Sequence, residues 1–161
     1  MTVGTAEQVA QFNENLDRAA DEVFSTMMGV RCEPAEPVPE QDRETLSAVI
    51  GLAGALSGSL VLRAGRRAAE RMAERLMGAA PEPAPQPALV RDAVGEVSNM
   101  VAGAWKGLDP RLASGCLLST PTVVAGSSYE FFSQRAPLRI ERAYSFEDMT
   151  FSVTLFCEQL S

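Results

Sequence analysis

The sequence contains no histidine, and this absence removes several kinds of chemistry at once. Hydrolases that activate a serine or cysteine through a histidine base cannot be built from this chain. A zinc site is also unexpected, because the three cysteines, Cys32, Cys116 and Cys157, are widely spaced and include no C-x-x-C pair. We therefore expect no bound metal and three reduced thiols in a cytosolic protein.

The chain also lacks long apolar runs, an excess of basic charge and an apolar leader. No stretch approaches the roughly 20 apolar residues that cross a bilayer, and residues 1–8 contain neither a basic residue nor an apolar signal region. The net charge of −7 and the pI near 4.7 argue against nucleic acid as the main partner and suit a partner with basic groups. These features predict a cytoplasmic protein with no membrane segment.

The hydrophobic pattern is typical of one domain over residues 1–161. Helices are predicted over residues 5–28, 66–77 and 88–107, and their ends are marked by Gly29, Gly78 and Gly107. Strands are predicted over residues 45–51, 57–63, 116–124, 129–134, 138–146 and 150–158, the third either continuous or bent at Pro121. Loops or turns are predicted over residues 32–40, 51–54, 79–88, 125–128 and 147–148, of which 79–88 is a Pro-rich internal surface loop. This order predicts an α+β fold with helices packed on a mostly antiparallel sheet.

Three polar residues recur on one face of the helix predicted over residues 88–107. Asp92, Glu96 and Asn99 follow the spacing Asp-x3-Glu-x2-Asn, which places their side chains within an arc of roughly 60°. This face lies opposite the apolar residues of the same helix, with Trp105 at the edge of the apolar side. A carboxamide beside carboxylates can orient a water molecule and dock on a basic partner.

The same stripe also has a purely structural interpretation. Polar residues on a solvent face are ordinary, and Asp92 near the helix start complements the helix dipole. Asn99 and the nearby Gly95 and Gly103, however, are poor residues for a helix interior. A helix that keeps them together is suited to close approach by another surface.

These residues resemble the motif of the CheX/CheC/FliY family of chemotaxis phosphatases, and most closely that of the CheX branch. The motif is Asp92-x3-Glu96-x2-Asn99, followed by Gly103 and Lys106. The later run Leu-Ser-Thr-Pro-Thr-Val-Val-Ala-Gly, residues 118–126, resembles the family's Pro-then-Gly strand after the motif helix. The order of the predicted elements is similar as well, so the resemblance covers roughly the whole chain.

The resemblance implies hydrolysis of the aspartyl phosphate of a CheY-like response regulator. Glu96 would pair with the regulator's active-site lysine, and Asn99 would orient the attacking water. Asp92, Gly103 and Lys106 would contact the partner, with Asp92 the more variable position. The resemblance implies no cofactor on this chain, because Mg²⁺ would be held by the receiver domain of the partner.

The resemblance also implies one active site per chain and a homodimer formed through sheet edges, as in the CheX branch. CheC-like relatives carry the motif twice. The N-terminal helix here offers only Arg18-x3-Glu22-x2-Ser25, which lacks the carboxamide.

Two other interpretations stay open from the sequence. The chain could be a non-catalytic module that docks on a receiver or on a flagellar-switch partner, or a structural dimer domain with an incidental polar stripe. The intact Glu96 and Asn99 pair favours the enzyme, because a scaffold has no need for the carboxamide.

Overall fold

The computed structural model describes residues 5–78 and 84–160. Their helical segments are α1 (Ala6–Val23), a π-helical turn η1 (Phe24–Met28), α2 (Arg66–Met77), α3 (Pro87–Gly107) and α4 (Pro110–Gly115). Their strands are β1 (Glu33–Ala35), β2 (Thr45–Gly54), β3 (Leu56–Gly65), β4 (Cys116–Leu118), β5 (Thr122–Gly126), β6 (Leu138–Phe146) and β7 (Met149–Leu160).

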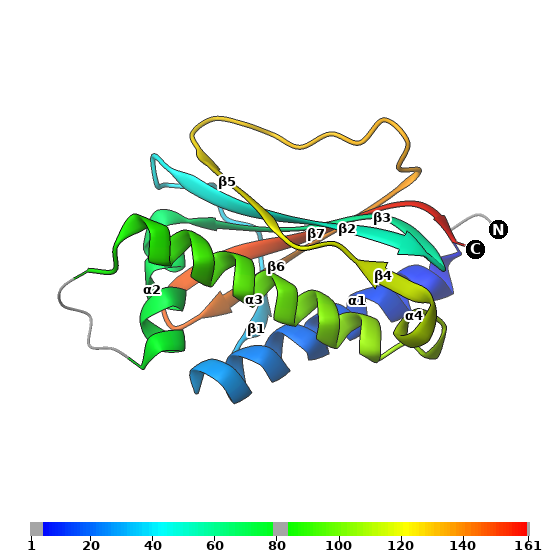
Figure 1. Cartoon of the computed structure of the whole chain (residues 1–161), viewed down its shortest axis with the longest axis horizontal. Helices are drawn as coiled ribbons and strands as arrows, with labels where there is room; N and C mark the ends of the chain where they lie inside the picture. The colour runs from blue at the N-terminus through cyan, green and yellow to red at the C-terminus, as the bar shows by residue number, and fades with distance from the viewer. Residues whose placement is uncertain (1–4, 79–83, 161) are drawn as a thin grey trace.

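The strands form one sheet in the order β1-β6-β7-β3-β2-β4, and β5 also pairs with β2. All of these pairs are antiparallel. In Figure 1 the helices lie below the central strands, while the segment between β5 and β6 arches above them. The predicted α+β fold with helices on an antiparallel sheet is confirmed.

Alternation along β2 shows how the sheet separates its two faces. Leu46, Ala48 and Ile50 are buried in the hydrophobic core that the helices cover. Ser47 lies between them and points to the opposite face, where its Oγ is 2.9 Å from the hydroxyl of Tyr129. The segment of residues 127–137, anchored by Tyr129, therefore covers part of the sheet face that the helices leave bare.

The first two helices begin and end where the sequence predicts. The Thr5 side chain accepts a hydrogen bond from the Gln8 backbone N–H at 3.1 Å and caps α1. Gly29 and Gly78 end their helices in the left-handed conformation, with φ values of 69° and 63°. One detail differs from the prediction, because the helix predicted over residues 5–28 changes from α to π geometry at Phe24.

Several predicted boundaries are wrong for identifiable reasons. The predicted turn at residues 51–54 is a continuation of β2, which pairs with β3 through Leu52. The predicted loop at 32–40 contains β1, whose Pro34 is tolerated because the strand is short and lies at the sheet edge. Helix α4 was not predicted, although Pro110 follows Asp109, whose side chain accepts from the Arg111 N–H and caps the helix.

The predicted strand at 129–134 is also wrong. The segment is irregular, and its Tyr129 and Phe131 rings contact each other edge to face. The bend expected at Pro121 separates β4 from β5, both of which pair with β2. The turn predicted at 125–128 begins later than expected, since β5 extends to Gly126. Residues 79–83 of the predicted Pro-rich loop lie outside the described residues, and its last two residues, 87 and 88, already belong to α3.

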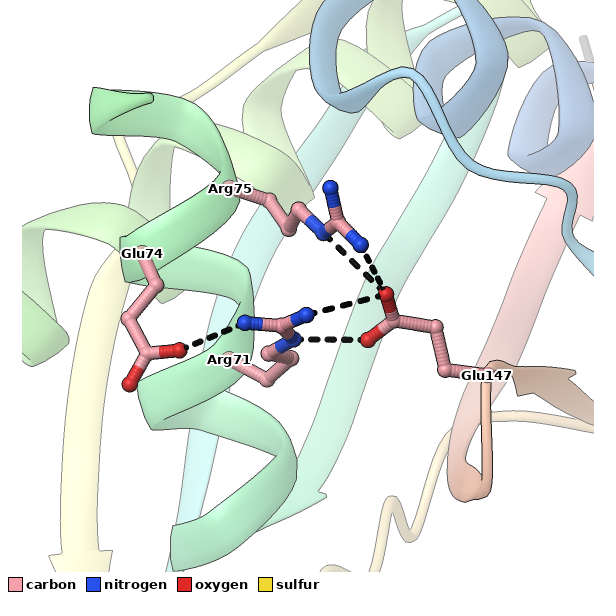
Figure 2. A network of polar contacts seen from close by, with 4 residues as sticks. All are labelled: Arg71, Glu74, Arg75 and Glu147. Carbon is pink, nitrogen blue, oxygen red and sulfur yellow. Dashed lines mark hydrogen bonds and ion pairs between the residues drawn. The ribbon is translucent and has the colours of Figure 1, made fainter. Parts of the chain in front are cut away.

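An ion cluster fixes the β6–β7 turn to α2. Both Arg71 and Arg75 donate to the Glu147 carboxylate, and Arg71 also donates to Glu74 at 2.9 Å, as Figure 2 shows. Glu147 has a φ of 53°, so the turn holds a non-glycine residue in the left-handed region. The hydrogen bonds from Arg71, followed by those from Arg75, lower the pKa of Glu147. The cluster compensates for the backbone conformation by tying the turn to a helix.

Candidate functional site

Helix α3 is held on three sides and open on the fourth. It packs on α1, on α2 and on strand β2, and its buried face includes Val90, Val94 and Val97. Trp105 is fully buried instead of lying at the edge of that face. Its Nε1 donates to the Phe12 carbonyl oxygen of α1 at 3.3 Å, and the two rings make an edge contact at 5.4 Å. The open face of α3 is therefore set by firm packing on the opposite side.

The open face carries every site residue that the sequence predicts. We call it the α3 ridge, and its residues recur three and four positions apart: Leu89, Asp92, Glu96, Asn99, Gly103 and Lys106. All are exposed except Lys106, which is half-buried. Leu89 was not part of the prediction, although it continues the same spacing toward the N-terminus.

The three motif side chains of the ridge are free of partners in the described part of the chain. Across residues 5–78 and 84–160, neither Asp92, Glu96 nor Asn99 makes a hydrogen bond or ion pair with its own protein. Asp92 is not a helix cap, because α3 begins at Pro87 and places Asp92 in its second turn. Two carboxylates one turn apart repel each other mildly, so their placement costs some stability that a basic partner would recover.

The two glycines near the motif have different surroundings. Gly95 is buried, and a Cβ built on it would lie 3.4 Å from Val123 and 3.5 Å from Pro121. The segment of β4 and β5 therefore packs closely on this side of α3. A Cβ built on Gly103 would meet nothing within 4 Å. The predicted close approach is thus internal at Gly95, whereas at Gly103 the helix backbone is open to a partner.

Lys106 and the cysteines complete the local electrostatics. Burial raises the pKa of the Cys116 thiol, and the charge of the nearby Lys106 opposes this rise only in part. Burial also raises the pKa of Cys32 and of Cys157 to about 12. All three cysteines are free and buried, so their thiols stay protonated at neutral pH.

The related pattern on α1 is arranged differently. Arg18 and Glu22 are exposed, but Ser25 lies in the π-helical turn η1, where the wider turn interrupts the helical phase. The Ser25 Oγ donates to Asp21 Oδ1 at 3.2 Å, and the same oxygen accepts from the Cys32 backbone N–H. The third position of this pattern is therefore used to hold the end of its own helix.

Two searches of the described residues bear on metals and membranes. Within residues 5–78 and 84–160, no group of three or more His, Cys, Asp and Glu side chains could hold a metal ion. Among the same residues, no helix has the length and apolar character to cross a membrane.

Comparison with known proteins decides the family. The model of the family described as chemotaxis phosphatase CheX matches residues 46–141, more than half of the chain. The chain belongs to the CheX family. The match spans β2 to the first part of β6 and includes the whole α3 ridge. None of the curated proteins matches the sequence.

Solved structures of CheX-family proteins share the fold. The chemotaxis protein CheX from Vibrio vulnificus is 24% identical, with 96% of this chain and 100% of that chain aligned and a TM-score of 0.78. A CheX from Desulfovibrio desulfuricans is 23% identical, covering 92% and 99% of the two chains at a TM-score of 0.75. The CheX in a CheX-CheY-BeF3-Mg²⁺ complex from Borrelia burgdorferi is 16% identical, covering 92% and 98% at a TM-score of 0.70.

Proposed function

We propose that this protein is a phosphatase that hydrolyses the aspartyl phosphate of a CheY-like response regulator in the cytoplasm. One observation carries the proposal: Glu96 and Asn99 lie three residues apart on the exposed ridge of a firmly packed helix, and no other described residue binds them. Membership of the chemotaxis phosphatase CheX family supports the same activity.

Asn99 would orient the attacking water. Its Oδ1 accepts a hydrogen bond from the water and its Nδ2 donates to a phosphoryl oxygen. The water oxygen forms a bond to phosphorus while the bond to the aspartyl oxygen breaks, releasing inorganic phosphate and a free carboxylate. An acyl phosphate is already activated, so positioning the water supplies most of what the reaction needs. An aspartate at this position would instead add negative charge beside the phosphate.

The rest of the ridge would hold the partner. Glu96 pairs with the regulator's lysine, and the Asp92 carboxylate one turn away adds to the local negative charge. Gly103 leaves room for the partner's backbone, and Lys106 pairs with an acidic group. A relative from Borrelia burgdorferi was solved as a CheX-CheY-BeF3-Mg²⁺ complex, which supports a CheY-like partner. We expect Mg²⁺ to belong to that receiver.

A phosphate-release assay tests the proposal. A receiver is phosphorylated by a small-molecule donor, and loss of phosphate is followed with wild type, Asn99→Ala, Asn99→Asp and Glu96→Gln. We expect Asn99→Ala to lower kcat by about 100-fold with docking largely kept, and Asn99→Asp to be no better. Glu96→Gln should raise KM by about tenfold, because the receiver's lysine loses its partner.

The outcomes separate the enzyme from the alternatives. A wild-type protein that binds the receiver but leaves its own decay rate unchanged is a docking module without turnover. A protein that binds none of the phosphorylated receivers of its own organism contradicts both partner hypotheses and leaves the structural interpretation.

We also propose a homodimer through sheet edges. β1 ends the sheet on one side, and β4 and β5, which both pair with β2, end it on the other, so these strands have edges without a neighbouring strand among the described residues. Sedimentation velocity measures the oligomeric state. A monomer at assay concentrations would rule out the dimer and leave the phosphatase proposal untouched, since each chain carries a whole ridge.

A further inference from the structure

The α3 ridge extends beyond the motif at its N-terminal end. Leu89 lies three residues before Asp92 and is 45% exposed. Among the residues of α3 it is the one large hydrophobic side chain with such exposure, while its neighbour Val90 is buried. At 1.5 Å per residue, Leu89 lies about 15 Å along the helix from Asn99, and the whole ridge is about 26 Å long.

The chemical character of the ridge therefore changes from one end to the other. An apolar side chain stands at its N-terminal end, two carboxylates and a carboxamide follow, and an ammonium group stands at its C-terminal end. A length of about 26 Å suits a standard interface of roughly 800 Å² per partner. Such an interface places apolar anchors beside its polar contacts.

A second copy of the chain does not fit this ridge. A two-fold axis between Glu96 and Asn99 would place Leu89 opposite the partner copy's ammonium at position 106, with four carboxylates at the centre and no cation among them. A receiver that offers a basic group at the centre and an apolar side chain beside it fits both parts of the ridge.

We propose that Leu89 is a docking residue for the same phosphorylated receiver, which would present an apolar side chain opposite it. This inference rests on the proposed function of Glu96 and Asn99. Because Leu89 lies about 15 Å from Asn99, it contributes to binding before and during the reaction alike. Its loss changes KM and leaves kcat unaffected.

Two exposed leucines allow a matched test. Leu89→Gln removes the apolar surface with a residue that suits helices. Leu117→Gln makes the same change on β4, where the leucine is 69% exposed and alternation with the buried Cys116 points it to the opposite face of the sheet. Although β4 lies at an edge of the proposed dimer, each chain carries a whole ridge, so the KM of this control does not depend on the oligomeric state. Leu89→Met keeps an apolar side chain. Initial rates of phosphate release are measured over a range of phosphoreceiver concentrations.

We expect Leu89→Gln to raise KM about fivefold with kcat unchanged within twofold, and Leu89→Met and Leu117→Gln to match wild type. An unchanged KM in Leu89→Gln, an equal rise in Leu117→Gln, or a fall in kcat alone would overturn the inference.

If wild type binds the receiver without turnover, the proposed function fails, and the same variants are compared by calorimetric Kd, where Leu89→Gln should bind about fivefold more weakly. If wild type binds no receiver, both proposals are wrong.

Discussion

Helices α1 and α3 pack against each other, yet they use their polar side chains in opposite ways. On α1, Asp17 binds Arg142 and Tyr144 of β6, with the closest contact at 2.7 Å, and Asp21 holds Ser25. On α3, Glu96 and Asn99 bind nothing among the described residues. A carboxylate on a helix surface is therefore not by itself a docking group, because its own chain can already bind it. The distinction lies in whether the fold already satisfies the side chains.

The most severe test exchanges the third residue of the x3-x2 pattern between the two helices, which is Asn99 on α3 and Ser25 on α1. Asn99→Ser gives α3 the residue of α1 and removes the carboxamide, so we expect receiver dephosphorylation to slow by about 100-fold. Adding Ser25→Asn in the same chain should restore nothing, because position 25 lies in the π-helical turn. Phosphate release from a phosphorylated receiver measures both. Recovery of activity in the double variant would mean that the phase of α1 does not matter.

A change of carboxylate on α1 should affect stability and leave docking intact. Asp17→Asn removes the charge that two donors bind, and we expect a loss of about 2 kcal/mol in the free energy of unfolding. The exposed Glu14→Gln is the control on the same helix and should stay within about 0.5 kcal/mol of wild type. Urea unfolding measures both variants. A larger effect on KM than on stability would place Asp17 at the partner surface and contradict the comparison.

The surface of α2 extends the comparison. Its Arg71 and Arg75 side chains are bound to Glu147 of the β6–β7 turn, just as Asp17 of α1 is bound to β6. We expect Glu147→Gln to cost about 1 kcal/mol at pH 7. Since the folded pKa of Glu147 is lowered, its stabilisation is complete above the ordinary carboxyl pKa and is lost as the pH falls through the folded value.

Urea unfolding of wild type and Glu147→Gln from pH 7 to pH 3 measures this effect. The two curves should converge toward acid, whereas the exposed Glu130→Gln should show no such trend. A difference that stays constant with pH would mean that the turn is stabilised by something other than the charge of Glu147.

The smallest effect is expected at Gly103, where stability and docking should move in opposite directions. Gly103→Ala adds a methyl group in open space and should stabilise α3 by up to about 1 kcal/mol. The same methyl group stands on the α3 ridge, and we expect KM for the receiver to rise about threefold. Thermal unfolding and steady-state kinetics of one preparation measure both. Added stability with an unchanged KM would show that no partner approaches this position closely.

The sequence predicted those parts of the fold that depend on local signals. Glycines at positions 29, 78 and 107 marked helix ends, and alternation identified β6 and most of β2, β3 and β7. The strand expected at 129–134 failed because alternation does not reveal whether a neighbouring strand edge is free to pair. Pro34 suggested a loop, yet an edge position allows a strand there.

The sequence predicted where the candidate site lies, but not whether its side chains are free of partners within the chain. Helical phase placed Asp92, Glu96 and Asn99 on one face, because that calculation uses only the helix itself. Whether a polar side chain is free depends on residues far along the chain, as the pairing of Asp17 with Arg142 illustrates. The three-and-four spacing that identified the motif would also have revealed Leu89, had it been followed one step toward the N-terminus.

Trp105, the one tryptophan of the chain, gives the molecule an optical probe of its own. Its indole is shielded from water and bound to α1 through the Phe12 carbonyl, while the residues around it on the ridge face outward. Its emission therefore responds when α1 separates from α3 and is insensitive to a tryptophan-free receiver bound on the outer side. Unfolding of this chain can thus be followed without a label while such a receiver is bound.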